Sequence, residues 1–212
     1  MALTNRYVDS TEGPLVNVNF TELTAGTGIA VLYLGDGDGP LYKLATSQFH
    51  AKAGFISVAS NGTLDLDFDT TLNMPLTLKG QAVVTLPLQL ENTSGVTKSP
   101  TRVWTITIRK YSGVTETDIV SGNVTISHTN LLTGASNSQN KTISLPLTVP
   151  LTNFKPADIL RVTVACATET PDSNSVYSHV GWDPAGRDIE VGTNISLEFN
   201  RSTFYCPIKL DL

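Results

Sequence analysis

The chain has 212 residues, a formal net charge of −5, 40% hydrophobic residues and only 16% charged residues. This length fits one large all-β domain, or one sandwich with a smaller appended region. An average globular domain has about 25% charged residues, so neutral Ser, Thr and Asn must cover much of this surface. Such a surface suits a protein that packs against neighbours. The scarcity of Lys and Arg, with Arg109-Lys110 as the densest cationic point, argues against nucleic acid as a partner.

The first ten residues lack the apolar segment of a signal peptide. The sequence also has no run approaching the ~18 apolar residues that a membrane span requires. We therefore expect a protein that is made in the cytoplasm of its host and has no membrane partner.

The first third of the chain contains short β-like segments separated by many glycines. The expected strands are residues 15–20, 28–34, 55–59 and 64–68, with residues 35–40 (GDGDGP) as a tight turn. Chain breakers near residue 71 suggest a division into an N-terminal β-rich region (1–71) and a larger domain (72–212).

Three carboxylates, Asp65, Asp67 and Asp69, share one face of the expected strand 64–68 and its continuation, because strand side chains alternate. A hard cation such as Ca²⁺ would relieve their repulsion. A solvated edge strand, protected by its charge from aggregation, is the interpretation we favour.

The second part of the chain shows long period-2 alternation of apolar and polar residues. It recurs in residues 83–90, 103–109, 142–149, 160–166, 194–200 and 204–212. Half-buried strands of this kind belong to antiparallel sheets. We therefore predict an all-β fold, an antiparallel jelly-roll sandwich with a smaller β-rich N-terminal region.

Single residues in these strands carry further predictions. Pro87, Pro146 and Pro207 lie on the polar side, so those strands are edges or pair on one side only at those points. Cys166 and Cys206 lie on the apolar side, where buried free thiols are favoured over a disulfide.

Signatures of catalysis are missing from the sequence. It has no Gly-x-Ser-x-Gly motif, and His50, His128 and His179 have no neighbouring Ser or Cys pattern that indicates a triad. His179 is expected in a polar loop. No zinc-ligand spacing or phosphate-binding loop is present. We predict no catalytic residues, no metal, no cofactor and no enzyme activity, although a site assembled in space is beyond the reach of these patterns.

A polar loop around Trp182 is the one candidate contact site. Together with Tyr177 and Arg187, its ring could stack on a sugar or fill a pocket in a neighbouring subunit. The alternative is a loop residue that folds back over the edge of the sheet.

Three ordered motifs carry a resemblance to a known group. They are residues 153–164 (NFKPADILRVTV), 180–187 (VGWDPAGR) and 205–212 (YCPIKLDL). In this order they resemble the jelly-roll domains of trimeric decoration (cement) and head-fibre proteins of tailed bacteriophages, which are similar in shape to the TNF/C1q trimer fold.

The resemblance implies a homotrimer on the outer surface of a virion capsid, with the major capsid protein as partner and stabilisation of the capsid as function. Residues 1–71 carry no part of the resemblance and would be the region that seats on the capsid. The alternative function is a receptor- or glycan-binding module in a head fibre, spike or tail.

Overall fold

The computed structural model describes residues 16–17, 26–36, 42–47, 54–59, 62–93, 96–127, 138–168, 176–182, 189–191, 195–197 and 202–209. Every regular element within these ranges is a β-strand, so the all-β prediction is confirmed. In the same ranges no helix has the length and apolarity needed to cross a bilayer.

Fourteen strands are described, and they follow one another along the chain without a helix among the described residues. They are β1 (Val16–Asn17), β2 (Thr27–Asp36), β3 (Tyr42–Ala45), β4 (Gly54–Ala59), β5 (Leu64–Thr71), β6 (Leu76–Asn92), β7 (Thr101–Tyr111), β8 (Glu116–Ser127), β9 (Ser138–Phe154), β10 (Ile159–Thr168), β11 (Val176–Trp182), β12 (Ile189–Val191), β13 (Ile195–Leu197) and β14 (Thr203–Lys209).

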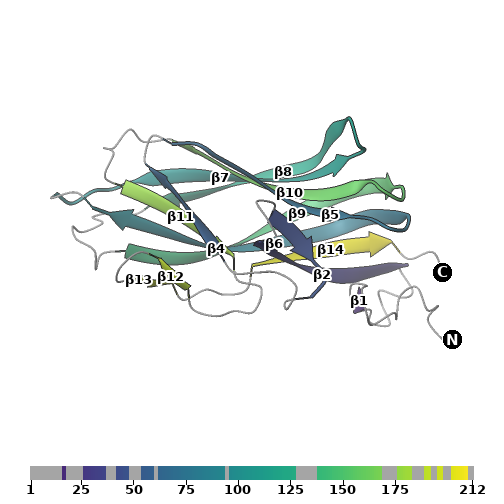
Figure 1. Ribbon diagram of the computed structural model, residues 1–212, viewed down its shortest axis with the longest axis horizontal. Coiled ribbons are helices and arrows are strands. Elements are labelled where there is room, and N and C mark those ends of the chain that lie inside the picture. The colour runs from purple at the N-terminus through teal and green to yellow at the C-terminus, as the bar shows by residue number, and fades with distance from the viewer. Residues whose placement is uncertain are drawn as a thin grey trace.

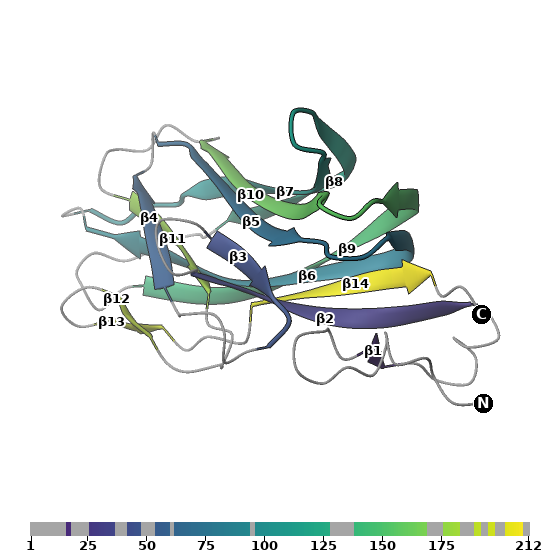
Figure 2. The same ribbon diagram turned by 45° about the vertical axis from the view of Figure 1, so that its right-hand side comes forward.

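Most of these strands belong to one sheet that folds back on itself. Its order is β4-β11-β6-β14-β2-β3-β5-β10-β7-β8, with β9 also on β6 and β1 on β2. Its pairings are antiparallel except for the short parallel pair of β3 with β5. Figures 1 and 2 show β9, β6, β14 and β2 as one layer, here the β6 layer, with β5, β10, β7 and β8 above it as the β10 layer. The result is the predicted antiparallel sandwich.

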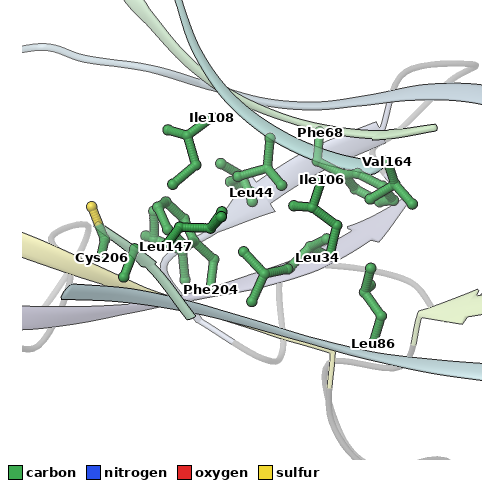
Figure 3. Close-up of a cluster of buried hydrophobic side chains, with 14 of the residues drawn as sticks. Leu34, Leu44, Phe68, Leu86, Ile106, Ile108, Leu147, Val164, Phe204 and Cys206 are labelled. Atoms are coloured by element: carbon green, nitrogen blue, oxygen red, sulfur yellow. The ribbon is translucent and has the colours of Figure 1, made fainter. Parts of the chain in front are cut away.

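Alternation along the strands builds the core between the two layers. In β6 the even-numbered residues from Ala82 to Leu90 are buried, and in β7 the same holds for Trp104, Ile106 and Ile108. In Figure 3, Leu86, Leu34 and Phe204 of the β6 layer face residues of the β10 layer across this core: Ile106, Ile108 and Val164. Burial of apolar area at roughly 25 cal/mol per Å² makes this interior the main source of stability.

The three strand prolines lie where a ladder has one partner. Pro146 is on β9, which pairs with β6. Pro87 lies on β6 between the end of the β14 pairing at Thr85 and the start of the β11 pairing at Leu88. Pro207 coincides with a register irregularity on the β6 side of β14. A proline cannot donate to a ladder, so the prediction of one-sided pairing is confirmed.

The sheet does not follow the proposed division at residue 71. β2 pairs with β14 at the far end of the chain, and β5 pairs with β10. β4 likewise pairs with β11. Strands from both sides of residue 71 therefore share one sheet, because a jelly-roll sandwich places distant segments side by side.

Both cysteines are buried, free thiols, as predicted. Cys206 is enclosed by the core, and burial raises the pKa of its thiol far above the usual range. It therefore packs as a small apolar side chain.

Candidate functional site

The two outer faces of the sandwich differ sharply in charge. The outward positions in the middle of the β6 layer, here called the neutral face, hold apolar and uncharged polar side chains: Ile29, Val31, Tyr33, Gln81, Val83, Thr85, Ser144, Pro146, Thr148, Thr203, Tyr205 and Pro207. Thr203 and Pro207 are buried there, and the exposed Lys79 and Lys209 border this part on β6 and β14. Their rows are set by register, with Pro146 beside Val83, Val83 beside Tyr205, and Tyr205 beside Val31. This row crosses four strands without a charge.

Tyr205 lies within this row and is 40% exposed. The flanking polar groups are paired with each other, since Thr85 Oγ1 and Ser144 Oγ lie 3.1 Å apart. An exposed aromatic ring among uncharged side chains is a composition typical of protein interfaces.

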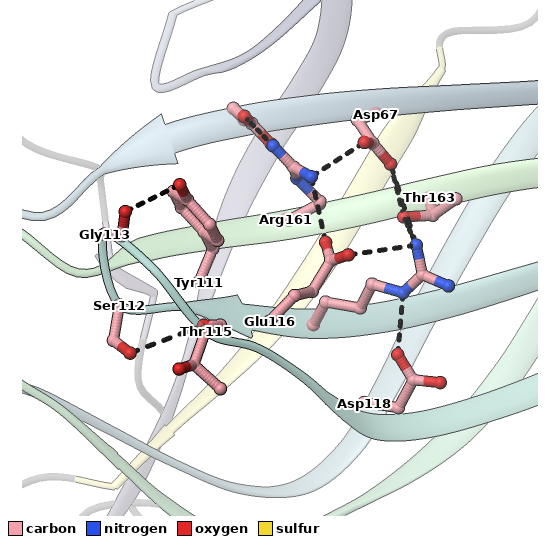
Figure 4. A network of polar contacts seen from close by, with 11 residues as sticks. Asp67, Tyr111, Ser112, Gly113, Thr115, Glu116, Asp118, Arg161 and Thr163 are labelled. Carbon is pink, nitrogen blue, oxygen red and sulfur yellow. Dashed lines mark hydrogen bonds and ion pairs between the residues drawn. The ribbon is translucent and has the colours of Figure 1, made fainter.

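The outer face of the β10 layer, here called the charged face, holds an ion-pair network (Figure 4). Arg161 of β10 donates two hydrogen bonds of 2.7 Å to the carboxylate of Asp69 on β5, from Nε and Nη2. Its Nη1 also lies 2.8 Å from Asp67 Oδ2 and 2.9 Å from Glu116 Oε1. The Asp69 carboxylate raises the pKa of this guanidinium above its usual range. Arg161 is therefore the centre of the network.

Arg109 of β7 extends the network to β8. Its Nε donates to Asp118 Oδ1 at 2.7 Å, and its Nη1 donates to Thr163 Oγ1 at 3.1 Å. The Thr163 hydroxyl in turn donates to Asp67 Oδ1 at 2.6 Å. The charged side chains of this network therefore pair with one another within the sheet.

The three aspartates share one face of β5, as predicted, but β5 is not an edge strand. It lies between β3 and β10 in the sheet order. The interpretation as a solvated edge is therefore wrong. Arginine supplies the positive charge for Asp67 and Asp69 that the alternative assigned to Ca²⁺. Among the described side chains, no group of three or more His, Cys, Asp or Glu could hold a metal ion.

At the other end of the β6 layer, three strands bring together a serine, a histidine and a glutamate. Ser57 on β4 lies directly opposite His179 on β11. Ser57 Oγ is 2.7 Å from His179 Nδ1, and His179 Nε2 is 3.1 Å from Glu91 Oε2 on β6. The serine is exposed, whereas the histidine is only 4% exposed.

Hydrogen-bond chemistry assigns the tautomer of His179. Burial lowers the pKa of the imidazole, while Glu91 acts in the opposite direction, so the ring is neutral near pH 7. A carboxylate can only accept, so Nε2–H donates to Glu91 and Nδ1 accepts the Ser57 hydroxyl proton. Tyr177 stacks beside the ring, with centroids 6.4 Å apart.

The predicted site residues separate in the structure. Trp182 is on β11, not in a loop, and is 2% exposed. Its ring packs edge-on against Tyr42 and Phe68, with centroids 5.0 and 5.7 Å away. A surface contact through Trp182 is therefore wrong, because the ring is part of the core. Tyr177 does face outward, half-buried beside His179, whereas Arg187, His50 and His128 lie outside the described residues.

The expectation that residues 177–182 form a loop failed for a visible reason. Ser178 occupies an inward position of β11 and is fully buried, while His179 points outward. A polar residue thus stands in the inward row of Val176, Val180 and Trp182, which hides the alternation of the strand. The Ser57–His179–Glu91 cluster gave no sequence signal, because its members are 34 to 122 residues apart in the chain.

Comparisons with known proteins show the fold alone. No protein-family model matches the chain, and no curated protein matches it. A CocE/NonD family hydrolase from Staphylococcus aureus is similar at a TM-score of 0.54 and 13% identity, over 86% of this chain and 37% of that one. An aminopeptidase from a marine sediment thaumarchaeon gives a TM-score of 0.52 and 12% identity, over 87% of this chain and 37% of that one.

The chain thus spans little more than a third of the length of these enzymes. Other β-rich proteins match at lower TM-scores: 0.30 for a carbohydrate-binding module, 0.26 for infectious bursal disease virus and 0.24 for a TNF protein from S. frugiperda.

These neighbours correct the prediction that the protein is not an enzyme. Hydrolases and an aminopeptidase share its β-sandwich, so absent sequence motifs are no ground for excluding catalysis. At this identity the likeness establishes the fold, and any activity must be argued from the chain's own residues.

Proposed function

We propose that this protein is a structural component of a virion that binds the outer surface of a capsid as a homotrimer. The observation that carries the proposal is the neutral face, where the apolar row Pro146–Val83–Tyr205–Val31 crosses four strands. Covering this row with a partner is favourable, because apolar area is buried and no charge within the row has to be desolvated.

The charged face supports the same assignment by contrast. Its arginines and carboxylates pair with one another within the sheet. Covering this side with a partner would require these charges to be desolvated, which is unfavourable. A molecule with one neutral and one charged side docks in one orientation. In a trimer, three such contacts act together, and modest individual affinities give firm attachment to a lattice.

The first experiment measures the mass of the purified chain by native mass spectrometry and light scattering. We expect three times the 22.7 kDa of one chain. Co-sedimentation with capsids that carry the major capsid protein then tests the partner. A wild-type chain that stays monomeric and never sediments with capsids contradicts the proposal.

A matched pair of variants tests which face docks. Tyr205→Lys places a charge in the neutral row, whereas Asn123→Lys places one on the exposed outer side of β8. Desolvating the new charge weakens association at least about tenfold in the first variant. The second variant should assemble like the wild type.

A further inference from the structure

The Ser57–His179–Glu91 cluster has the hydrogen-bond order of an activated serine. The hydroxyl of Ser57 donates to His179 Nδ1 over 2.7 Å, and the opposite ring nitrogen donates to Glu91 over 3.1 Å. A nucleophile within reach of a base, with the base oriented by a third group, is the relation that defines nucleophilic catalysis on unrelated folds.

The burial of each group fits its role in this chain of hydrogen bonds. Ser57 is exposed and can meet a substrate, whereas His179 is enclosed behind it. The Glu91 side chain is 16% exposed and fixes the ring from the far side. A neutral, oriented imidazole is the state that accepts a proton.

The position of β4 in the sheet offers backbone donors. The sheet order described begins at β4, which pairs there with β11. In an antiparallel pair, alternate residues direct their N–H away from the partner. Either Ser57 or both of its neighbours, Ile56 and Val58, therefore direct a backbone N–H toward the side of β4 that has no partner among the described strands. A donor in that position can stabilise an oxyanion.

We propose that Ser57 is the nucleophile of an acyl-transfer site that acts on small carboxylic esters, with His179 as general base and Glu91 as positioning residue. Ser57 Oγ bonds to the acyl carbon while its proton passes to His179 Nδ1. The leaving alcohol takes that proton as its bond to the acyl carbon breaks. Water then attacks the acyl-serine, its proton passes through His179 to Ser57 Oγ, and the carboxylic acid leaves.

The test labels the intact chain with a fluorophosphonate and locates the adduct by mass spectrometry. We expect modification at Ser57, with a rate that falls at least about a hundredfold in His179→Gln, because general-base assistance is removed. Ser127→Ala is the matched control, since Ser127 is an exposed serine of β8 whose hydroxyl lies 3.0 Å from that of Thr101. Its labelling rate at Ser57 should equal that of the wild type.

Two further measurements separate catalysis from a structural role. Hydrolysis of p-nitrophenyl acetate should require Ser57 and rise with pH as His179 loses its proton. The titratable groups facing the ring in the described contacts are Glu91 and Tyr177. Glu91 raises the pKa of His179, so Glu91→Gln should move the inflection of the rate profile to lower pH.

Thermal unfolding of each variant shows whether the fold is kept. Should His179→Gln unfold, His179→Asn and Glu91→Gln supply the same comparison. Labelling that is absent from Ser57, equal at Ser57 and Ser127, or unchanged in folded His179 variants overturns the proposal. These assays use the purified chain without capsids, so their outcome is independent of the proposed virion role.

Discussion

The two outer faces of the sandwich have the same strand geometry and opposite chemistry. On the charged face, Arg161 and Arg109 join carboxylates from β5 and β8 into one network. On the neutral face, the corresponding outward positions are Tyr, Val, Pro, Thr and Ser. The first face stabilises the sheet through contacts within the chain. The second exposes Tyr205 and Pro146, which can contact another molecule.

The largest effect on stability is expected from Arg161→Met on the charged face. The change leaves Asp67, Asp69 and Glu116 without their shared cation, and we expect the free energy of unfolding to fall by about 2 kcal/mol. Urea unfolding of the variant measures it. Lys141→Met at an exposed position of β9 is the control and should change stability by less than about 0.5 kcal/mol. An equal, small loss in both variants would show that the network contributes little.

The next effect comes from the seam where the two layers meet. A Cβ added at Gly122 of β8 would lie 2.6 Å from Leu147 Cδ2 and 3.2 Å from Leu145 Cδ2 of β9. Leu147 is buried, so it must repack, and Gly122→Ala should cost about 1 kcal/mol. Adding Leu147→Val to the variant should recover part of that loss. If Gly122→Ala is as stable as the wild type, β8 and β9 are not in close contact.

A smaller effect is expected from pH at the serine–histidine end of the β6 layer. Burial lowers the pKa of His179 in the folded protein, so below about pH 6.5 the unfolded chain binds a proton that the folded chain does not. Stability contributed by His179 is therefore complete above that pH and is lost as the pH falls. The loss between pH 7 and 5.5 should be smaller in His179→Gln, as measured by thermal unfolding at both values. A larger loss in the variant would contradict the buried neutral ring.

The smallest effect on stability is expected from Tyr205→Lys on the neutral face. The ring is 40% exposed, so the free energy of unfolding of the single chain should change by about 0.5 kcal/mol or less. The same variant should lose association, which makes it the inverse of Arg161→Met. Unfolding at a dilution where the wild type is monomeric measures the first effect. Loss of stability without loss of association would assign Tyr205 to the fold instead of an interface.

Local patterns predicted the strands wherever polarity followed burial. Trp104 and Cys166 lie inside, and Pro87 and Pro146 lie where pairing is one-sided, because alternation and the missing proline N–H act at each residue separately. β11 was missed because the polar Ser178 occupies an inward position between Val176 and Val180.

Contacts between distant strands were beyond these patterns. The sequence by itself determined an all-β chain, the inward side of its long strands and a surface poor in charge, since each depends on neighbouring residues. Only the tertiary structure decided that Arg161 meets Asp69, that strands from both ends of the chain share one sheet, and that Ser57, Glu91 and His179 adjoin. The physical reason is that register and sheet order are set by packing of the whole sandwich, which no single segment contains.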